Sequence, residues 1–182
     1  MKSVPNLTDE QYDSLTLQML GFIHAVNRFR GGGQHVRDLL PDLYAWAEDR
    51  SLPCRLDDPV NPKHVHFAQA EALERFAMAD WALGEASGLG ADWYLYVEDG
   101  ELVPAFRFAR NAVHHDRVLA IETSGFEEKP LIRSEVLRLK WASIESQRAG
   151  RRAYDEQLLG QTISLGLLRA NLVLSRGALI VV

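Results

Sequence analysis

The sequence has a single cysteine and therefore no pair for an internal disulfide. It also has no long uninterrupted hydrophobic run and no excess of basic charge. Cys54 has no second thiol with which to form an internal disulfide, which agrees with a reducing cytoplasm. No segment reaches about 18 consecutive apolar residues, so we expect no membrane-spanning helix. The residues after Lys2 hold no apolar run, so we expect no secretory signal. These absences predict a cytoplasmic protein without a membrane partner.

Length and composition indicate an ordinary globular chain. Its 182 residues are enough for one domain, expected over 1–182. Hydrophobic residues make up 47% and charged residues 25%, which excludes a long disordered chain and a disulfide scaffold. The net charge of -5 provides no global basic field that would attract nucleic acid or anionic lipid.

Apolar residues at helical spacing predict an all-α domain. Thr8 and Gln11 have the spacing of a capping box, and the glycines 31–33 end the helix that follows. Pro41 is expected to kink the second helix or to divide it. The expected helices cover about 8–30, 34–50, 64–87, 101–115 and 150–175. The fold class is therefore a helical bundle of about five helices.

Two segments have a less regular pattern. The short apolar run 93–97 fits a strand as well as a helical turn. In 117–144, β-compatible runs at 118–121 and 136–141 flank a polar connection that contains Pro130. We therefore expect a small β-hairpin insertion between the fourth helix and the C-terminal helix.

The fourth helix carries the residues with the clearest chemical pattern. Arg110 and Asn111 are followed by His114 and His115. This arrangement resembles the signature of the HEPN superfamily, in which an Arg, often followed by Asn, precedes a His by about four to six residues. The flanking segment 106–111 and the doubled His also resemble HEPN-like prokaryotic proteins of about this length. The specific similarity covers about ten residues.

The resemblance implies a metal-independent endoribonuclease without a cofactor, which works as a homodimer and leaves 2′,3′-cyclic phosphate ends. Such proteins serve as toxins or phage-defence effectors, and an antitoxin or regulatory protein is an expected partner. The residue types fit this chemistry. Arg110 provides a planar cation for phosphate oxygens, and the imidazole of His115 can act as base and then as acid. Asn111 can orient the phosphate or the ring, and His114 ranks second to His115.

The same motif raises a geometric problem. On an ideal helix Arg110 and His114 share a face, whereas Arg110 and His115 lie about 140° apart. Either the helix loosens near His115, or the His completes a site with other groups, including those of a second subunit. The spacing is also matched by Arg107 with His114, and by Arg28 or Arg30 with the histidine at position 35.

The alternative to an enzyme is a non-catalytic helical module that binds RNA, dimerises or binds a protein partner. Charge distribution bears on this choice, because segment 129–152 holds seven basic residues and two glutamates, a net charge of about +5. A local basic surface fits phosphate binding, and so does an ordinary solvated face. The expected RNA contacts are Arg148, Arg151 and Arg152 in this segment and Arg107 on the fourth helix.

Several other side chains were weighed as functional candidates. Glu74 or Asp80 of the third helix is a candidate for contact with the motif. The aromatic run at 93–96 favours core packing over base stacking. His64 and His66 lack a carboxylate or thiol at ligand spacing, so no metal site is expected.

Overall fold

The computed structural model describes residues 7–122 and 130–181, and it confirms the all-α class. The α-helices of this part are α1 (Asp9–Arg30), α2 (Val36–Glu48), α3 (Pro62–Ser87), α4 (Leu102–Asn111), α5 (Arg133–Val136), α6 (Arg151–Gln157) and α7 (Ile163–Val181). They are accompanied by two 3₁₀-helices, η1 (Arg55–Asp57) and η2 (Gly90–Tyr96), and by a π-helical turn, η3 (Ala112–Asp116).

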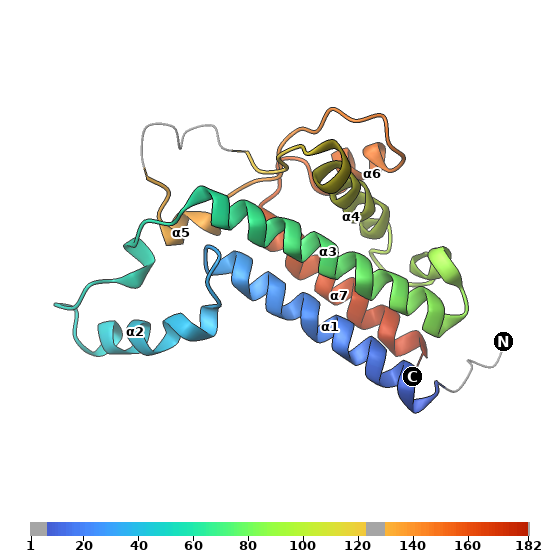
Figure 1. The fold of residues 1–182 in the computed structure, drawn as a ribbon, viewed down its shortest axis with the longest axis horizontal. Helices are drawn as coiled ribbons and strands as arrows, with labels where there is room; N and C mark the ends of the chain where they lie inside the picture. The colour runs from blue at the N-terminus through green and yellow to red at the C-terminus, as the bar shows by residue number, and fades with distance from the viewer. Residues whose placement is uncertain (1–6, 123–129, 182) are drawn as a thin grey trace.

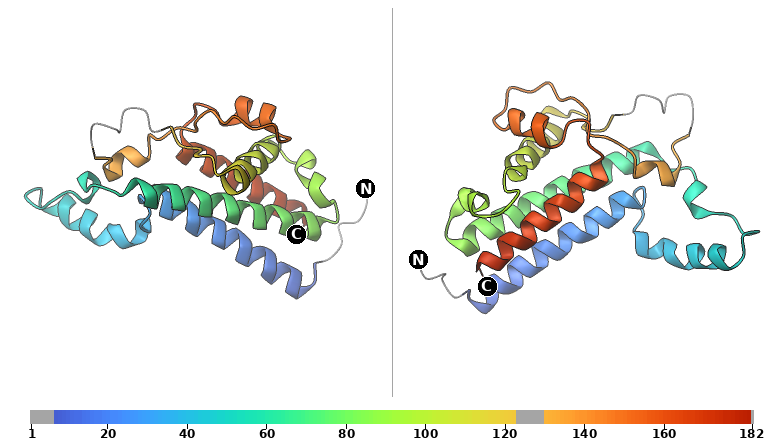
Figure 2. Two further views of the ribbon diagram at one scale, coloured as in Figure 1. Left: turned by 45° about the horizontal axis from the view of Figure 1, so that its top comes forward. Right: turned by 180° about the vertical axis from the view of Figure 1, so that it is seen from behind.

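The long helices α1, α3 and α7 run side by side, and α4 lies across α3 (Figures 1 and 2). α6 packs against α4, while α2 projects from one end of the bundle (Figure 1). A chain of aromatic rings crosses the core between these layers. The ring centroid of Phe76 lies 5.8 Å from that of Phe22 and 4.7 Å from that of Phe106, which lies 5.7 Å from Trp141. This shared core fixes α4 on α3.

The boundaries of α1 follow from local chemistry. The Gln11 N–H donates to Thr8 Oγ1 at 3.2 Å, and the Thr8 N–H donates to Gln11 Oε1 at 3.0 Å, so the capping box is confirmed. Gly32 and Gly33 have φ values of 70° and 95°, in the left-handed region that glycine enters at little cost. The predicted end of the helix is therefore confirmed.

Two of the open expectations are now decided. Pro41 lies inside one helix, α2, which continues through it to Glu48. The run 93–97 falls largely within the 3₁₀-helix η2, with Trp93 buried beneath it. A helical turn, not a strand, therefore connects α3 to α4.

The expected β-hairpin in 117–144 is wrong for the residues that the structure describes, and 123–129 lie outside them. These residues hold no strand, only isolated bridges such as Ile121 with Trp141. Trp141 also bridges to Leu159, so the segment changes partner before a ladder can extend. The first residue of the second β-compatible run, Val136, belongs to α5. Ile121, Leu139 and Trp141 are buried in the core as individual side chains and not as one face of a sheet.

The expected C-terminal helix over 150–175 is also wrong as one continuous element. It is divided into α6 and α7, and the break lies between Gln157 and Ile163. Gly160 has a φ of 73°, and its N–H donates to the Trp141 carbonyl at 3.1 Å. The left-handed glycine and the bridge to a distant segment replace the helical hydrogen bonds here.

Helix α7 is, by length and composition, apolar enough to cross a membrane. A core helix meets the same criterion, and 44% of the relevant window of α7 is buried in the bundle. Its buried face includes Leu167, Ala170 and Leu174, while Leu165 and Leu172 are exposed.

Candidate active site

The end of α4 widens into the π-helical turn η3, and this turn brings His115 back toward Arg110. Arg117, with a φ of 55°, closes the turn by donating its N–H to the Ala112 carbonyl five residues earlier. Such i→i+5 turns often occur at functional sites inside or beside α-helices. Arg110 Nη1 thus lies 3.4 Å from His115 Nε2. The loosening that the sequence left open as one alternative is present, and it resolves the 140° discrepancy.

The guanidinium of Arg110 is held on two edges. Its Nε donates to Glu74 Oε2 at 2.9 Å and its Nη2 to Glu74 Oε1 at 3.3 Å, a bidentate pair between α4 and α3. Its Nη1 donates to Asn111 Oδ1 at 3.2 Å, on the side that faces His115. Glu74 therefore fixes the orientation in which Arg110 presents Nη1 to the histidine.

The two adjacent histidines have different surroundings. His114 Nε2 lies 3.3 Å from the Ala70 carbonyl of α3 and 3.7 Å from Glu74 Oε2. His115 faces Arg110 instead. The hydrogen bond from Arg110 lowers the pKa of Glu74 most, against an opposing effect of partial burial, and the positive fields of Arg110 and the histidines add to it. Glu74 thus stays ionised and keeps Arg110 paired.

This cluster is accessible to a ligand. The side chains of Arg110 and Glu74 are 28% and 40% exposed. Arg110 can only donate, so its 3.4 Å contact with His115 Nε2 is a hydrogen bond in the tautomer in which Nε2 is the acceptor. The arrangement joins a fixed cation, an amide oxygen and an imidazole nitrogen within hydrogen-bonding reach. Such a set can bind an anionic oxygen and accept a proton beside it.

Arg107 lies one turn earlier on α4, and its side chain is as exposed as that of Arg110, but its carboxylate partner is buried. Its Nε and Nη2 each donate to Asp80 at 2.7 Å, and Nη2 also donates to the Ala91 carbonyl at 2.9 Å. Trp93 Nε1 donates to the same carboxylate at 2.8 Å, and the guanidinium lies 5.1 Å from the Tyr94 ring. Burial is the largest single effect and disfavours the cation, but the hydrogen bonds to Asp80 and the negative fields of Asp80, Tyr94 and Asp92 together outweigh it and raise the pKa of Arg107.

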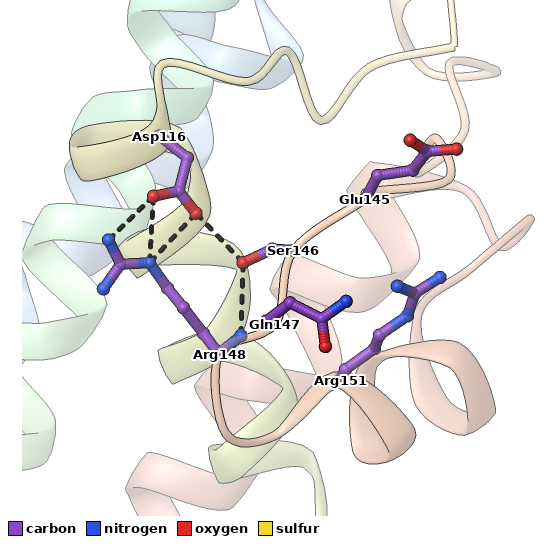
Figure 3. A pocket seen from close by; sticks show the side chains of 6 residues that line it. All are labelled: Asp116, Glu145, Ser146, Gln147, Arg148 and Arg151. Carbon is purple, nitrogen blue, oxygen red and sulfur yellow. Dashed lines mark hydrogen bonds and ion pairs between the residues drawn. The ribbon is translucent and has the colours of Figure 1, made fainter.

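The basic segment is attached to the end of the motif through Asp116, the residue after His115. Arg148 donates to both oxygens of Asp116, with its Nη2 2.7 Å from Oδ1, and Ser146 Oγ donates to Oδ2 at 3.0 Å (Figure 3). The Arg148 hydrogen bonds lower the pKa of Asp116. A pocket of about 770 Å³ opens beside this pair, and its lining residues are Asp116, Glu145, Ser146, Gln147, Arg148 and Arg151 (Figure 3).

The other expected RNA contacts lie on α6. Arg152 Nε contacts Glu156 Oε1 at 2.8 Å, and Arg151 Nε lies 3.6 Å from Asp155 Oδ2. Each of these three arginines therefore has a carboxylate partner. Arg148 and Arg151 line the pocket, and the carboxylate contact of Arg151, at 3.6 Å, is the longer of the two.

In the alternative pair Arg28 and His35, which also matches the motif spacing, both side chains contact other residues. Arg28 contacts Glu71 at 2.8 Å, and His35 Nε2 lies 3.3 Å from His24 Nδ1. Within 7–122 and 130–181, no group of three or more potential metal-binding side chains occurs. His66 has its pKa lowered by burial.

Sequence reasoning weighed Glu74 together with Asp80 and did not separate their roles. The structure places Glu74 on Arg110 and Asp80 on Arg107. The sequence analysis did not identify Asp116 or the pocket beside it. The available signal was an acidic residue directly after the doubled histidine, followed by a basic segment that contains Arg148.

Comparisons with models of protein families, with curated proteins and with solved structures find no match to this chain. The resemblance to the HEPN superfamily therefore rests on the sequence motif alone.

Proposed function

We propose that this chain is a metal-independent endoribonuclease of the HEPN type, with Arg110, Asn111 and His115 at its centre. The observation that carries the proposal is the 3.4 Å approach of Arg110 Nη1 to His115 Nε2 across a π-helical turn. A plain α-helix would separate these two groups, so the widened turn is what unites the motif.

The proposed reaction is transesterification within the RNA strand. Bound RNA takes the place of the 3.4 Å contact between Arg110 Nη1 and His115 Nε2, so that Nε2 accepts the proton of the 2′-hydroxyl and the 2′-oxygen attacks the adjacent phosphorus. The bond from phosphorus to the 5′-oxygen breaks, that oxygen takes a proton from solvent water, and His115 returns the proton it accepted to solvent. The products are a 2′,3′-cyclic phosphate and a 5′-hydroxyl end. Arg110 stabilises the charge that develops on the phosphate oxygens, and Asn111 orients the group that lies against them.

A second copy of the chain is the expected partner, with α4 at or beside a two-fold interface. The exposed face of α3 supports this placement. Phe67, Met78 and Trp81 are exposed on it, at spacings that put them on one side of the helix together with Glu74. Light scattering should give a dimer, and Trp81→Arg should shift it toward monomer. Leu172→Arg, on the exposed side of α7, is the matched control, and a monomeric wild type contradicts the assembly.

The test of the activity is incubation of purified protein with end-labelled RNA in excess EDTA. We expect cleavage to persist, because no step uses a metal-activated water. Mapping of the new ends should find 2′,3′-cyclic phosphate. Loss of cleavage in EDTA with recovery on addition of a divalent ion contradicts the proposed mechanism.

One observation favours the alternative, a non-catalytic HEPN-like module for RNA binding, dimerisation or protein interaction. Arg110 already has two of its nitrogens on Glu74, as in a structural ion pair. In that case the protein binds RNA or a partner without producing new ends, and Arg110→Ala changes affinity only. Among active HEPN proteins, the resemblance favours a cytoplasmic toxin or phage-defence effector with an antitoxin or regulatory partner.

A further inference from the structure

The pocket beside Asp116 contains polar groups that the proposed cleavage does not use. Glu145, Gln147 and Arg151 line one part of it, and the Asp116–Arg148 pair lines the other (Figure 3). Within the part of the chain that the structure describes, Glu145 and Gln147 have no hydrogen-bond or ion-pair partner. Arg151 makes only the 3.6 Å contact of its Nε with Asp155, so its two Nη groups remain available.

The pocket is held in place relative to the motif. Asp116 directly follows His115, and its carboxylate binds both Arg148 and Ser146 of the loop that carries Glu145 and Gln147. The pocket therefore begins at the residue that follows the proposed base in the sequence. Its volume of about 770 Å³ is within the range of small-molecule sites and exceeds the size of one nucleobase.

The free groups discriminate among bases. An ionised carboxylate only accepts hydrogen bonds, and it has two oxygens side by side. On the Watson–Crick edge, guanine alone offers two adjacent donors, N1–H and the N2 amino group, which match those oxygens. Adenine, cytosine and uracil each present a single donor position next to an acceptor. The amide of Gln147 and the guanidinium of Arg151 supply donors for the neighbouring guanine O6.

We propose that this pocket binds the guanine base of a nucleotide adjacent to the cleaved phosphate, with Glu145 reading N1–H and N2. The inference rests on the proposed ribonuclease function and adds a sequence preference to it. Single-stranded RNA is commonly recognised in this way, through bases turned out of the stack and read on their Watson–Crick edges. Arg148 is a positioning residue, because its Nε and Nη2 bind Asp116 and hold the loop in place.

The experiment uses short labelled RNAs that differ at one position: guanosine, inosine, which lacks the N2 amino group, or 7-deazaguanosine, which keeps the whole Watson–Crick edge. Cleavage next to guanosine should exceed cleavage next to inosine by about tenfold, because one hydrogen bond to a charged group is lost. 7-Deazaguanosine should be cut like guanosine. Glu145→Gln should remove the difference between guanosine and inosine, while Glu48→Gln, an exposed change on α2, should retain it. Equal rates for the three RNAs, or an unchanged preference in Glu145→Gln, overturn the inference.

A binding arm separates this inference from the proposed function. The affinities of the same RNAs are measured by fluorescence anisotropy, with guanosine monophosphate as a competitor. If the protein cuts none of the RNAs but binds guanosine RNA about tenfold more tightly than inosine RNA, and only with Glu145 intact, the proposed function fails and the pocket assignment stands. Equal affinities overturn the assignment. If guanosine monophosphate binds as tightly as the RNA, the ligand is a free nucleotide and the RNA assignment is wrong.

Discussion

Two arginine–carboxylate pairs connect α4 to α3, and they have opposite surroundings. Arg107 meets Asp80, whose side chain is 8% exposed, and both oxygens of that carboxylate accept hydrogen bonds, Oδ1 from Arg107 and Trp93 and Oδ2 from Arg107. Arg110 meets Glu74, which is 40% exposed, and one nitrogen of its guanidinium is directed at His115. A closed pair holds the helices together, whereas an open pair presents a charge. The difference separates a structural arginine from a candidate catalytic one.

The largest effect should come from the open pair. Arg110→Ala removes the contact to the developing phosphate charge and should slow RNA cleavage by about 10²–10³. His115→Ala removes proton transfer and should slow it by about 10²–10⁴. The double variant should lose little more than the worse single one, because both groups serve one step. Single-turnover assays on one labelled RNA measure all three.

His114→Ala is the matched control for His115→Ala. It removes the neighbouring histidine, which contacts the Ala70 carbonyl and Glu74 and does not face Arg110, so it should slow cleavage less. Circular dichroism should find all of these variants folded. Full activity in His115→Ala with loss in His114→Ala would transfer the catalytic role to His114.

The closed pair should affect stability more than chemistry. Arg107→Ala leaves the carboxylate of Asp80 buried with Trp93 as its remaining side-chain donor. We expect the free energy of unfolding to fall by about 2–4 kcal/mol, since one partner of a mostly buried charge pair is lost. Denaturant titration measures this change. A loss smaller than that of Arg110→Ala would remove the distinction between the two pairs.

The smallest effect should come from Glu74→Gln. The pair is partly solvent-exposed, so the loss of stability at neutral pH should be less than about 1 kcal/mol. Arg110 lowers the pKa of Glu74 in the folded state. The stabilisation is therefore fully present above the ordinary glutamate pKa of about 4.3 and is lost as the pH falls through the lower folded value. Thermal denaturation of both proteins between neutral and acidic pH should show their difference vanish on the acid side.

The sequence predicted the helices that carry strong local signals. The capping box at Thr8 and the glycines after Arg30 depend on neighbouring residues, and both were confirmed. The β-hairpin expected in 117–144 was wrong, because the burial of Ile121 and Trp141 depends on contacts with distant parts of the chain. The apolar residues of these β-compatible runs are buried in the core without pairing into a sheet.

At the site, spacing identified the candidate residues but not their partners. The motif on α4 fixes where Arg110 lies, whereas its pairing with Glu74 depends on how α3 crosses α4. In the same way, the three arginines expected to bind RNA were chosen by charge. Their carboxylate partners, such as Asp116 for Arg148, became evident only from the fold.

The widened turn also has a consequence for register. A π-turn contains one residue more than an α-turn. The residue that lies beside Arg110 is therefore the fifth one after it, and not the fourth as in an α-helix. If the turn tightened to an α-helix, His114 would move into that place and His115 would rotate away. With histidine at both positions, a one-residue change of register leaves an imidazole next to the guanidinium. The doubled histidine thus makes the pairing tolerant of the local winding of the helix.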